Sequence, residues 1–128
     1  MPDILERNIE EITCEAYNDD PTRVRRVARV MPDDDAFETA SVLLKAIADP
    51  VRARILYALT LEPLCVCELA TLLAMSMSAV SHHLKVLTLS GLLKVKKEGK
   101  FACYYFKDEH LANTLVTLVR DLTKEKAA

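Results

Sequence analysis

The sequence has little glycine, few aromatic residues and no tryptophan. Only two of its 128 residues are glycine, and abundant Leu, Ala and Val favour a mostly helical protein. No apolar stretch approaches the roughly 18 residues of a membrane-spanning helix. The N-terminal residues also lack the basic and then apolar order of a secretion signal. These absences lead us to expect a cytoplasmic protein without a membrane partner.

Motifs of common enzyme sites are also missing. The chain has no Cys-x-x-Cys pair, no Ser-His-Asp arrangement and no glycine-rich loop to hold a nucleotide, so we expect no enzyme. About half of the residues are hydrophobic (51%), with no low-complexity run, which indicates a folded globular chain. We divide it into an N-terminal extension (1–31), one folded domain (32–124) and a short tail (125–128).

Charge is divided unevenly along the chain, although the net charge is only −2. Residues 1–75 carry eight Lys or Arg against fourteen Asp or Glu, whereas residues 76–107 carry six lysines against one glutamate. A local excess of positive charge is what binding to nucleic-acid phosphates requires. On charge alone, a solvated lysine-rich hairpin is the alternative interpretation.

The spacing of apolar residues predicts several helices and one hairpin. Helices are expected over 5–16, 36–48, 50–61, 65–73, 78–90 and 108–124, with a short helical stretch at 23–29. The helices over 65–73 and 78–90 have helix-turn-helix spacing. Two β-rich runs, 92–97 and 101–106, then flank Glu98-Gly99-Lys100 and predict a hairpin. The predicted fold is therefore mainly α with a small β-hairpin, a winged helix-turn-helix.

The helix over 78–90 has one apolar and one polar face. Val80, Leu84 and Leu87 form the apolar stripe, and His83 beside it is expected to pack. The opposite face carries hydroxyls, an imidazole and an ammonium, which reach base edges and phosphates in a major groove. Its residues are Ser78, Ser81, His82 and Lys85. We expect this face to bind double-stranded DNA; a merely solvated polar face is the alternative.

The hairpin extends the basic surface. Lys94 and Lys96 alternate with Leu93 and Val95, which places the ammonium groups on one face and the apolar groups toward the core. Such a wing can follow the phosphate backbone beside the groove. The lysines expected to do so are Lys94, Lys96, Lys97 and Lys100.

Cys65 and Cys67 are the first candidate metal ligands. On a regular helix they would lie about 200° apart, but Pro63 places them at an irregular helix start. A helix N-terminus lowers a thiol pKa and favours the thiolate that metals bind. Two thiolates suit soft ions such as Cd(II), Pb(II), Zn(II) or a trivalent metalloid. Two small buried hydrophobic residues are the alternative.

Four segments together resemble a known family. They are Leu-Lys-Ala-Ile-Ala-Asp-Pro-Val-Arg-Ala-Arg-Ile (44–55), Leu-Cys-Val-Cys-Glu-Leu-Ala (64–70), Ser-Ala-Val-Ser-His-His-Leu-Lys-Val-Leu (78–87) and Glu-Gly-Lys (98–100). Over about 36–122 the chain is similar to the ArsR/SmtB metal-responsive repressors, especially their cadmium- and lead-responsive CadC type. The resemblance implies a homodimer, joined through the C-terminal helix, that binds an inverted-repeat operator and is released by Cd(II) or Pb(II), with Zn(II) as a further effector.

The same resemblance implies a third thiolate. Cys14 matches a ligand of the extension that reaches the cysteine pair of the other protomer, whereas Asn18 stands where that extension has a second cysteine. Three sulfurs suit Pb(II); Cd(II) would take a fourth ligand from water, Asn18, Asp19 or Asp20. Cys103, in the second strand of the wing, is interpreted as a packed strand residue and kept as a further candidate ligand.

A second family site lies on the C-terminal helix. Asp108 and His110 match its first two ligands, and Asp121 and Lys124 stand at the partner positions. A lysine ammonium has no lone pair to donate, so we expect no functional zinc site there and interpret Asp108 as a helix cap.

Two other functions stay open at this point. An arsenite- or antimonite-responsive repressor is one, although Ala70 stands three residues after Cys67, where such repressors can have a third cysteine. A non-regulatory thiol protein that binds metal is the other, although it would not need a basic wing.

Overall fold

A computed structural model describes residues 20–127, with side chains described up to residue 124. The predicted helix over 5–16 and Cys14 therefore lie outside the described residues. The chain forms two compact units, Met1–Asp34 and Asp35–Ala128. In the described part of the first unit, helix α2 (Pro21–Val30) begins at Asp20, whose side chain accepts hydrogen bonds from the Thr22 and Arg23 backbones. This confirms the short basic helix expected there.

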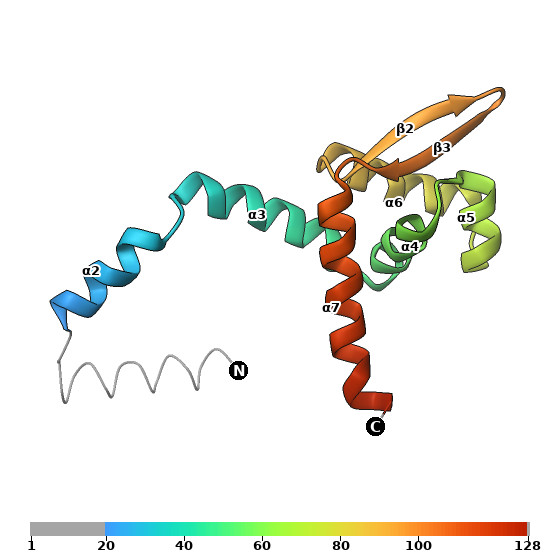
Figure 1. Cartoon of the computed structure of the whole chain (residues 1–128). Helices are drawn as coiled ribbons and strands as arrows, with labels where there is room; N and C mark the ends of the chain where they lie inside the picture. The colour runs from blue at the N-terminus through green and yellow to red at the C-terminus, as the bar shows by residue number, and fades with distance from the viewer. Residues whose placement is uncertain (1–19, 128) are drawn as a thin grey trace. The chain divides into compact units, whose positions relative to one another are not determined.

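The second unit is mostly helical with one small sheet (Figure 1). Its helices are α3 (Asp34–Ile47, which begins at the unit boundary), α4 (Pro50–Leu61), α5 (Val66–Leu73), α6 (Met77–Leu89) and α7 (Glu109–Ala127). Its strands are β1 (Leu64–Cys65), β2 (Leu93–Glu98) and β3 (Phe101–Phe106), antiparallel in the order β1-β3-β2. The predicted fold class is confirmed, but strand β1 was not predicted.

Local capping explains where α3 ends and α4 begins. The Asp49 carboxylate accepts a hydrogen bond of 2.9 Å from the Arg52 backbone, and this bond holds the pKa of Asp49 below its ordinary value. Pro50 follows as the first residue of α4, where its missing N–H costs nothing. The Arg52 Nε donates to the Ala46 carbonyl at 2.6 Å, which satisfies an unpaired carbonyl at the end of α3.

The turn between α5 and α6 is short and capped on both sides. Ala74 ends α5 in the left-handed conformation, with φ of 53°, and the Met75 N–H donates to the Ala70 carbonyl at 3.0 Å. Ser76 then caps α6 by accepting a hydrogen bond of 3.1 Å from the Ala79 backbone. These contacts build the predicted helix-turn-helix.

The core lies between the helix-turn-helix, α4 and the inner side of the sheet. Its fully buried side chains are Ile55, Leu56, Leu69, Val80, Leu84 and Leu87. Val80, Leu84 and Leu87 are the apolar stripe expected on α6, and their complete burial confirms it. Because this stripe packs inward, the opposite face of α6 is turned to solvent.

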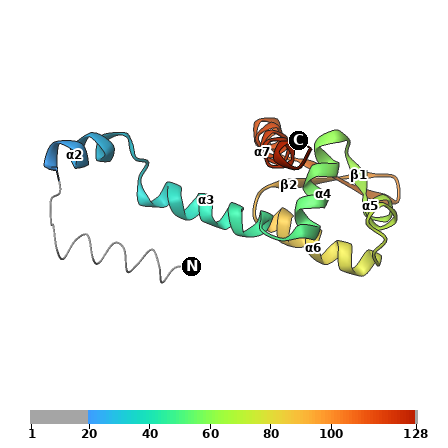
Figure 2. The same cartoon turned by 90° about the horizontal axis from the view of Figure 1, so that it is seen from below.

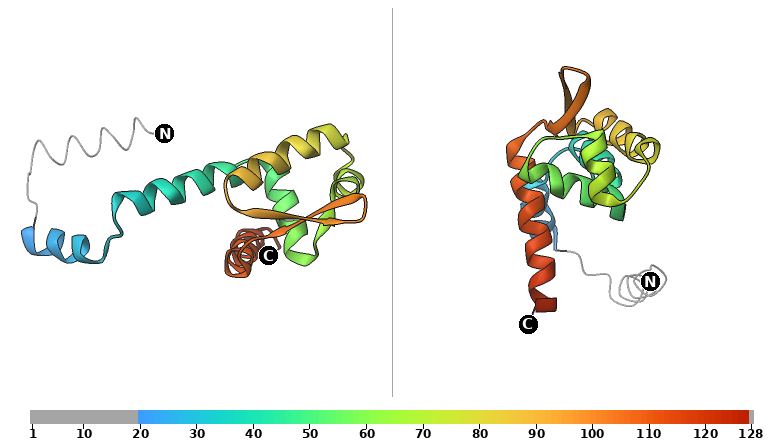
Figure 3. Two further views of the ribbon diagram at one scale, coloured as in Figure 1. Left: turned by 90° about the horizontal axis from the view of Figure 1, so that it is seen from above. Right: turned by 90° about the vertical axis from the view of Figure 1, so that its right-hand side faces the viewer.

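Strand register gives the sheet two different faces. Residues that pair across neighbouring strands share a face. The core face carries Leu64, Tyr104 and Leu93, which pack against the hydrophobic core. On the outer face, Cys65 pairs with Cys103 and Cys103 pairs with Lys96. Figure 3 shows the β2–β3 hairpin projecting from the helices.

Candidate nucleic-acid interface and thiol site

The polar face of α6 is exposed along its length. Ser78, Ser81, His82 and Lys85 all lie at the surface. Helix α6 packs beside β2, so the helix that carries this face adjoins the wing (Figure 1). The arrangement offers hydroxyl, imidazole and ammonium groups together, the groups that contact base edges and phosphates.

His83 has a different environment from His82. It is half-buried, and its Nδ1 lies 3.5 Å from the Arg52 Nη1. A guanidinium can only donate, so the His83 Nδ1 accepts and the proton of a neutral ring is on Nε2. His83 thus connects α6 to α4, which agrees with the packing role expected for it.

The wing lysines are all exposed. Lys94 and Lys96 share the outer face of the sheet, as the alternation predicts, whereas Lys97 is on the other face. Lys100 follows Gly99, whose φ of 63° allows the tight turn between the two strands. The hairpin therefore places ammonium groups on both faces near its tip.

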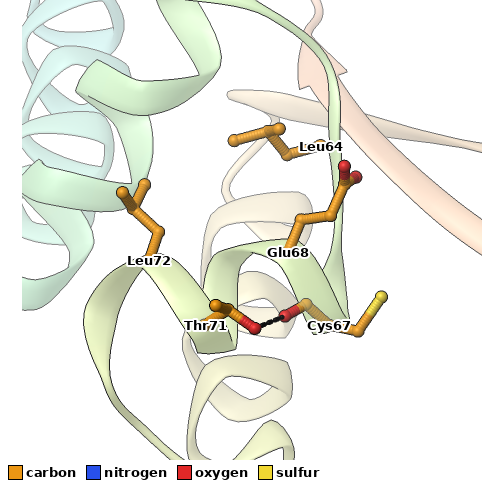
Figure 4. Close-up of a pocket in the computed structure, with 5 residues that line it drawn as sticks. All are labelled: Leu64, Cys67, Glu68, Thr71 and Leu72. Carbon is orange, nitrogen blue, oxygen red and sulfur yellow. Dashed lines mark hydrogen bonds between the residues drawn. The ribbon is translucent and has the colours of Figure 1, made fainter.

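Cys65 and Cys67 occupy different kinds of position. Cys65 is the last residue of β1 and the N-cap of α5, with an extended backbone, and its N–H donates to the Glu68 Oε1 at 2.9 Å. Cys67 lies within α5, half-buried, in a shallow pocket with Leu64 and Leu72 (Figure 4). The sulfur of Cys67 points away from Leu72 in that view. The irregular helix start that Pro63 predicts is therefore present at Cys65, whereas Cys67 already lies in the helix.

The sulfur of Cys65 contacts Cys103. The two Sγ atoms are 2.6 Å apart, and this contact, followed by burial and the Glu68 carboxylate, raises the pKa of Cys65 to about 12. The lowered thiol pKa expected at the start of a helix is therefore wrong for Cys65, because these neighbours outweigh the helix N-terminus. Cys103 is only 9% exposed, as expected of a packed strand residue, but it lies on the outer face of the sheet. Its pairing with Cys65 was missed because no local sequence signal marks the two-residue strand β1.

Within residues 20–124, no three Cys, His, Asp or Glu side chains are gathered as a ready metal site. The thiols brought together there are those of Cys65 and Cys103. Any further ligand must come from a rearrangement, from water, from a partner or from residues outside the described part, where Cys14 lies.

The candidate ligands on α7 are separated within one protomer. The Asp108 Oδ1 accepts a hydrogen bond of 2.8 Å from the His110 backbone, which gives Asp108 the capping role expected for it. Asp121 lies roughly 17 Å beyond His110 along the helix axis, at about 1.5 Å for each residue, and forms an exposed ion pair with Lys124 at 3.7 Å.

Large apolar side chains remain exposed on α3 and α7. Leu44 is 63% exposed, Leu118 52% and Leu122 65%. Leu44 and Leu118 line one apolar pocket together with Ala40 and Leu111. A contiguous exposed apolar surface of this kind marks an association site. Among the described residues, no helix is both long and apolar enough to cross a membrane.

Comparisons with known proteins agree with this geometry. Residues 49–95 match the family described as bacterial regulatory protein, arsR family. A cadmium resistance transcriptional regulatory protein CadC homolog of Staphylococcus aureus is 36% identical over 99 residues, covering 77% of this chain and 81% of that protein. A transcriptional repressor SmtB homolog of Synechocystis is 36% identical over 91 residues, covering 71% of this chain and 69% of that protein.

A solved structure shares the fold as well. The homodimeric winged helix-turn-helix DNA-binding domain Mb0332 of Mycobacterium bovis superposes with a TM-score of 0.65 at 26% identity, covering 77% of this chain and 92% of that one. The sequence matches and the shared fold lead to one conclusion: the chain belongs to the arsR family of bacterial regulatory proteins, which are winged-helix transcription regulators.

Proposed function

We propose that the protein is a metal-responsive repressor that binds operator DNA as a metal-free homodimer and is released when Cd(II) or Pb(II) binds cysteine thiolates. Zn(II) is a further effector of the same kind. One observation carries this proposal: the thiols of Cys65 and Cys67 lie at the N-cap and in the first turn of α5, and the next helix, α6, has an exposed polar face and packs beside the lysine-bearing strand β2. The relative named for cadmium resistance supports the choice of metal.

DNA recognition in this proposal uses both exposed surfaces. The face of α6 that carries Ser78, Ser81, His82 and Lys85 enters the major groove and contacts base edges. The wing lysines Lys94, Lys96, Lys97 and Lys100 contact phosphates and fix the register of the protein on the duplex. Two copies of α6 would read the halves of an inverted repeat on one side of the duplex if their centres lie about 34–36 Å apart.

The homodimer would form through the apolar surface of α3 and α7. Leu44, Leu118 and Leu122 are more than half exposed in the single chain, and a partner would remove them from water. The homodimeric state of the Mycobacterium bovis domain supports this assignment. Asp108, His110 and Asp121 are not part of the proposed effector site, because Lys124 stands at the remaining ligand position and its ammonium has no lone pair to donate.

The metal would act on the helix-turn-helix from its first residue. Cys65 and Cys67 supply soft thiolate ligands, which suit Cd(II), Pb(II) and Zn(II), and Cys14 of the partner protomer is proposed to complete the set. Because Cys65 caps α5, a metal that moves its side chain also moves the helix that supports α6. Bound metal would then weaken the free energy of DNA binding by about 1–3 kcal/mol, and bound DNA would weaken metal binding by the same amount.

The test is a binding titration on a duplex from the protein's own promoter that contains an inverted repeat. Fluorescence anisotropy would follow DNA release as Cd(II) or Pb(II) is added under reducing conditions, with Mg(II) as the hard-ion control. We expect DNA affinity to fall about 5- to 150-fold with the soft ions. A Cys65→Ser, Cys67→Ser protein should bind the same DNA and stay bound.

Three outcomes would contradict the proposal. Continued release of the double variant by Cd(II) would remove these thiols from the mechanism. Release by arsenite or antimonite alone would favour the metalloid-responsive repressor. Failure of the wild-type protein to distinguish the inverted repeat from unrelated DNA would favour a non-regulatory metal-binding protein.

A further inference from the structure

Cys103 is placed against Cys65 by the pairing of strands, although 38 residues separate them in the sequence. Cys65 and Cys103 stand opposite each other in the antiparallel pair β1–β3, so both side chains leave the same face of the sheet. Their sulfurs are 2.6 Å apart. Figure 2 shows that β1 leads directly into α5, so this contact joins the start of the helix-turn-helix to the wing.

The thiol of Cys103 is buried but is not part of the main hydrophobic core cluster. A core cysteine acts as a small hydrophobic residue, but this cluster contains Leu93, with Tyr104 and Leu64 packed against it, all from the opposite face of the sheet. Cys103 is 9% exposed and has Cys65 and Lys96 as its cross-strand neighbours. Packing within the main core cluster therefore does not account for a cysteine at this position.

Two carboxylates lie near the thiol pair, although the four groups do not form a ready metal site in this arrangement. The Glu98 Oε2 is 4.0 Å from the Cys103 Sγ, and the Glu68 Oε1 is 2.9 Å from the backbone nitrogen of Cys65. The negative charges of the Glu68 and Glu98 carboxylates attract a cation, and deprotonation of the two thiols would add further negative charge. Lys96 lies on the same face of the sheet, opposite Cys103, but its ammonium is at the end of an exposed, flexible side chain.

We propose that Cys103 is a metal ligand that, together with Cys65, binds a soft divalent ion on the outer face of the wing sheet. The inference rests on the metal-responsive function proposed above and adds a ligand to it. Glu98 is the nearest oxygen donor to the pair. For zinc, metal–sulfur bonds of about 2.3 Å require the two sulfurs of one tetrahedral ion to be roughly 3.8 Å apart, so the pair must open by at least about an ångström, and further for the larger Cd(II).

A metal held in this way connects two parts of the DNA-binding surface. Cys65 is the N-cap of α5, and Cys103 is in the strand that pairs with the lysine-bearing β2. Opening the pair shifts the start of α5 relative to the wing. The wing and the helix-turn-helix would therefore respond to the same ion.

The experiment is a Cd(II) titration of the full-length protein, without DNA, under reducing and oxygen-free conditions. Thiolate-to-cadmium charge-transfer absorption reports the number of sulfur ligands, and a competing chelator reports the affinity. We expect Cys103→Ser to lower the charge-transfer absorbance per bound Cd(II) by about as much as Cys65→Ser lowers it. The affinity for Cd(II) should weaken by ~10-fold or more. The two substitutions should also be strongly non-additive, because each removes a ligand of the same ion.

Ala102→Ser is the matched control, since it places a hydroxyl on the same strand but on the opposite face, and it should change neither quantity. Circular dichroism checks that each variant folds. A measurement on the wild-type protein avoids substitution altogether: NMR with an NMR-active cadmium isotope should show coupling from the metal to the β-protons of both Cys65 and Cys103.

Unchanged absorbance and affinity in Cys103→Ser, or a cadmium spectrum without coupling to Cys103, would overturn the inference. A Cys65–Cys103 disulfide that persists under the reductant and prevents Cd(II) binding would also overturn it. Because DNA is absent from this titration, failure of the inference can be distinguished from failure of the proposed function: Cd(II) bound through Cys103 without release from DNA would refute only the regulatory role.

Discussion

The two faces of the wing sheet differ in what their residues do. On the core face, Leu93 is 2% exposed and packs with Tyr104 and Leu64. On the outer face, Lys96 is exposed and Cys103 contacts another thiol. Successive residues of a strand point to opposite sides, so neighbours in sequence have unrelated roles. In strands of only two to six residues, this alternation places the residues that stabilise the fold on one face and the thiol and ammonium groups on the other.

The largest stability effect should come from the core face. Leu93→Ala removes a nearly fully buried side chain and leaves a cavity, so we expect the free energy of unfolding to fall by about 2–5 kcal/mol. Urea denaturation measures it. Lys94→Ala, one residue along and on the outer face, should change it by less than about 0.5 kcal/mol. Equal losses in the two variants would contradict the division between faces.

Removing outer-face charge should weaken DNA binding. Lys94→Ala with Lys96→Ala removes two ammonium groups from each protomer. The plot of log affinity against log salt should become shallower by about 0.9 for each phosphate that the protein no longer neutralises. The measurement is anisotropy over a salt series, with Lys124→Ala on α7 as control. If the slope does not change, the outer face of the wing does not bind phosphates.

Cys103 should matter less for stability than its burial suggests. Because Cys103 lies outside the core cluster, we expect Cys103→Ser to lower the free energy of unfolding of the metal-free protein by less than about 1 kcal/mol. Thermal and urea unfolding without metal would measure it. If Cys103→Ser lowered the free energy of unfolding as much as Leu93→Ala does, Cys103 would be a core-packing residue, and its assignment as a ligand would be weakened.

The smallest effect on stability is expected at Val95, where the core face of the sheet becomes exposed to solvent. Val95 points to the same side as Leu93 but is 48% exposed, because the hairpin has extended beyond the helices. We expect Val95→Thr to change the free energy of unfolding by less than about 0.5 kcal/mol. A larger loss that depends on protein concentration would show that a second copy covers this part of the wing.

Local patterns were sufficient to predict most of the fold. The helix-start signal Asp49-Pro50 located α4, and Gly99 located the turn of the hairpin. The helical spacing of Val80, Leu84 and Leu87 identified the buried side of α6. The exposed polar face of α6 follows from the same period. These features depend on residues a few positions apart, which a sequence records directly.

The thiol site was less predictable because it depends on pairing between distant segments. Strand β1 has only two residues, too few for an alternating pattern, and it pairs with a strand 38 residues later. The sequence placed Cys65 beside Cys67 in the chain, but the sheet places Cys65 beside Cys103. Cys14 lies outside the described residues, so its role as a third ligand stays a prediction.

The position of Cys103 outside the main core cluster would have a consequence for how a sensor that used it as a ligand changes over time. If Cys103 contributes as little to folding as predicted above, the proposed ligand could be exchanged for histidine, aspartate or an aliphatic residue without loss of the fold. Each exchange alters which ion is preferred, while the lysines of β2 and the polar face of α6 stay as they are. Metal preference and operator choice can therefore drift independently in chains that share this wing.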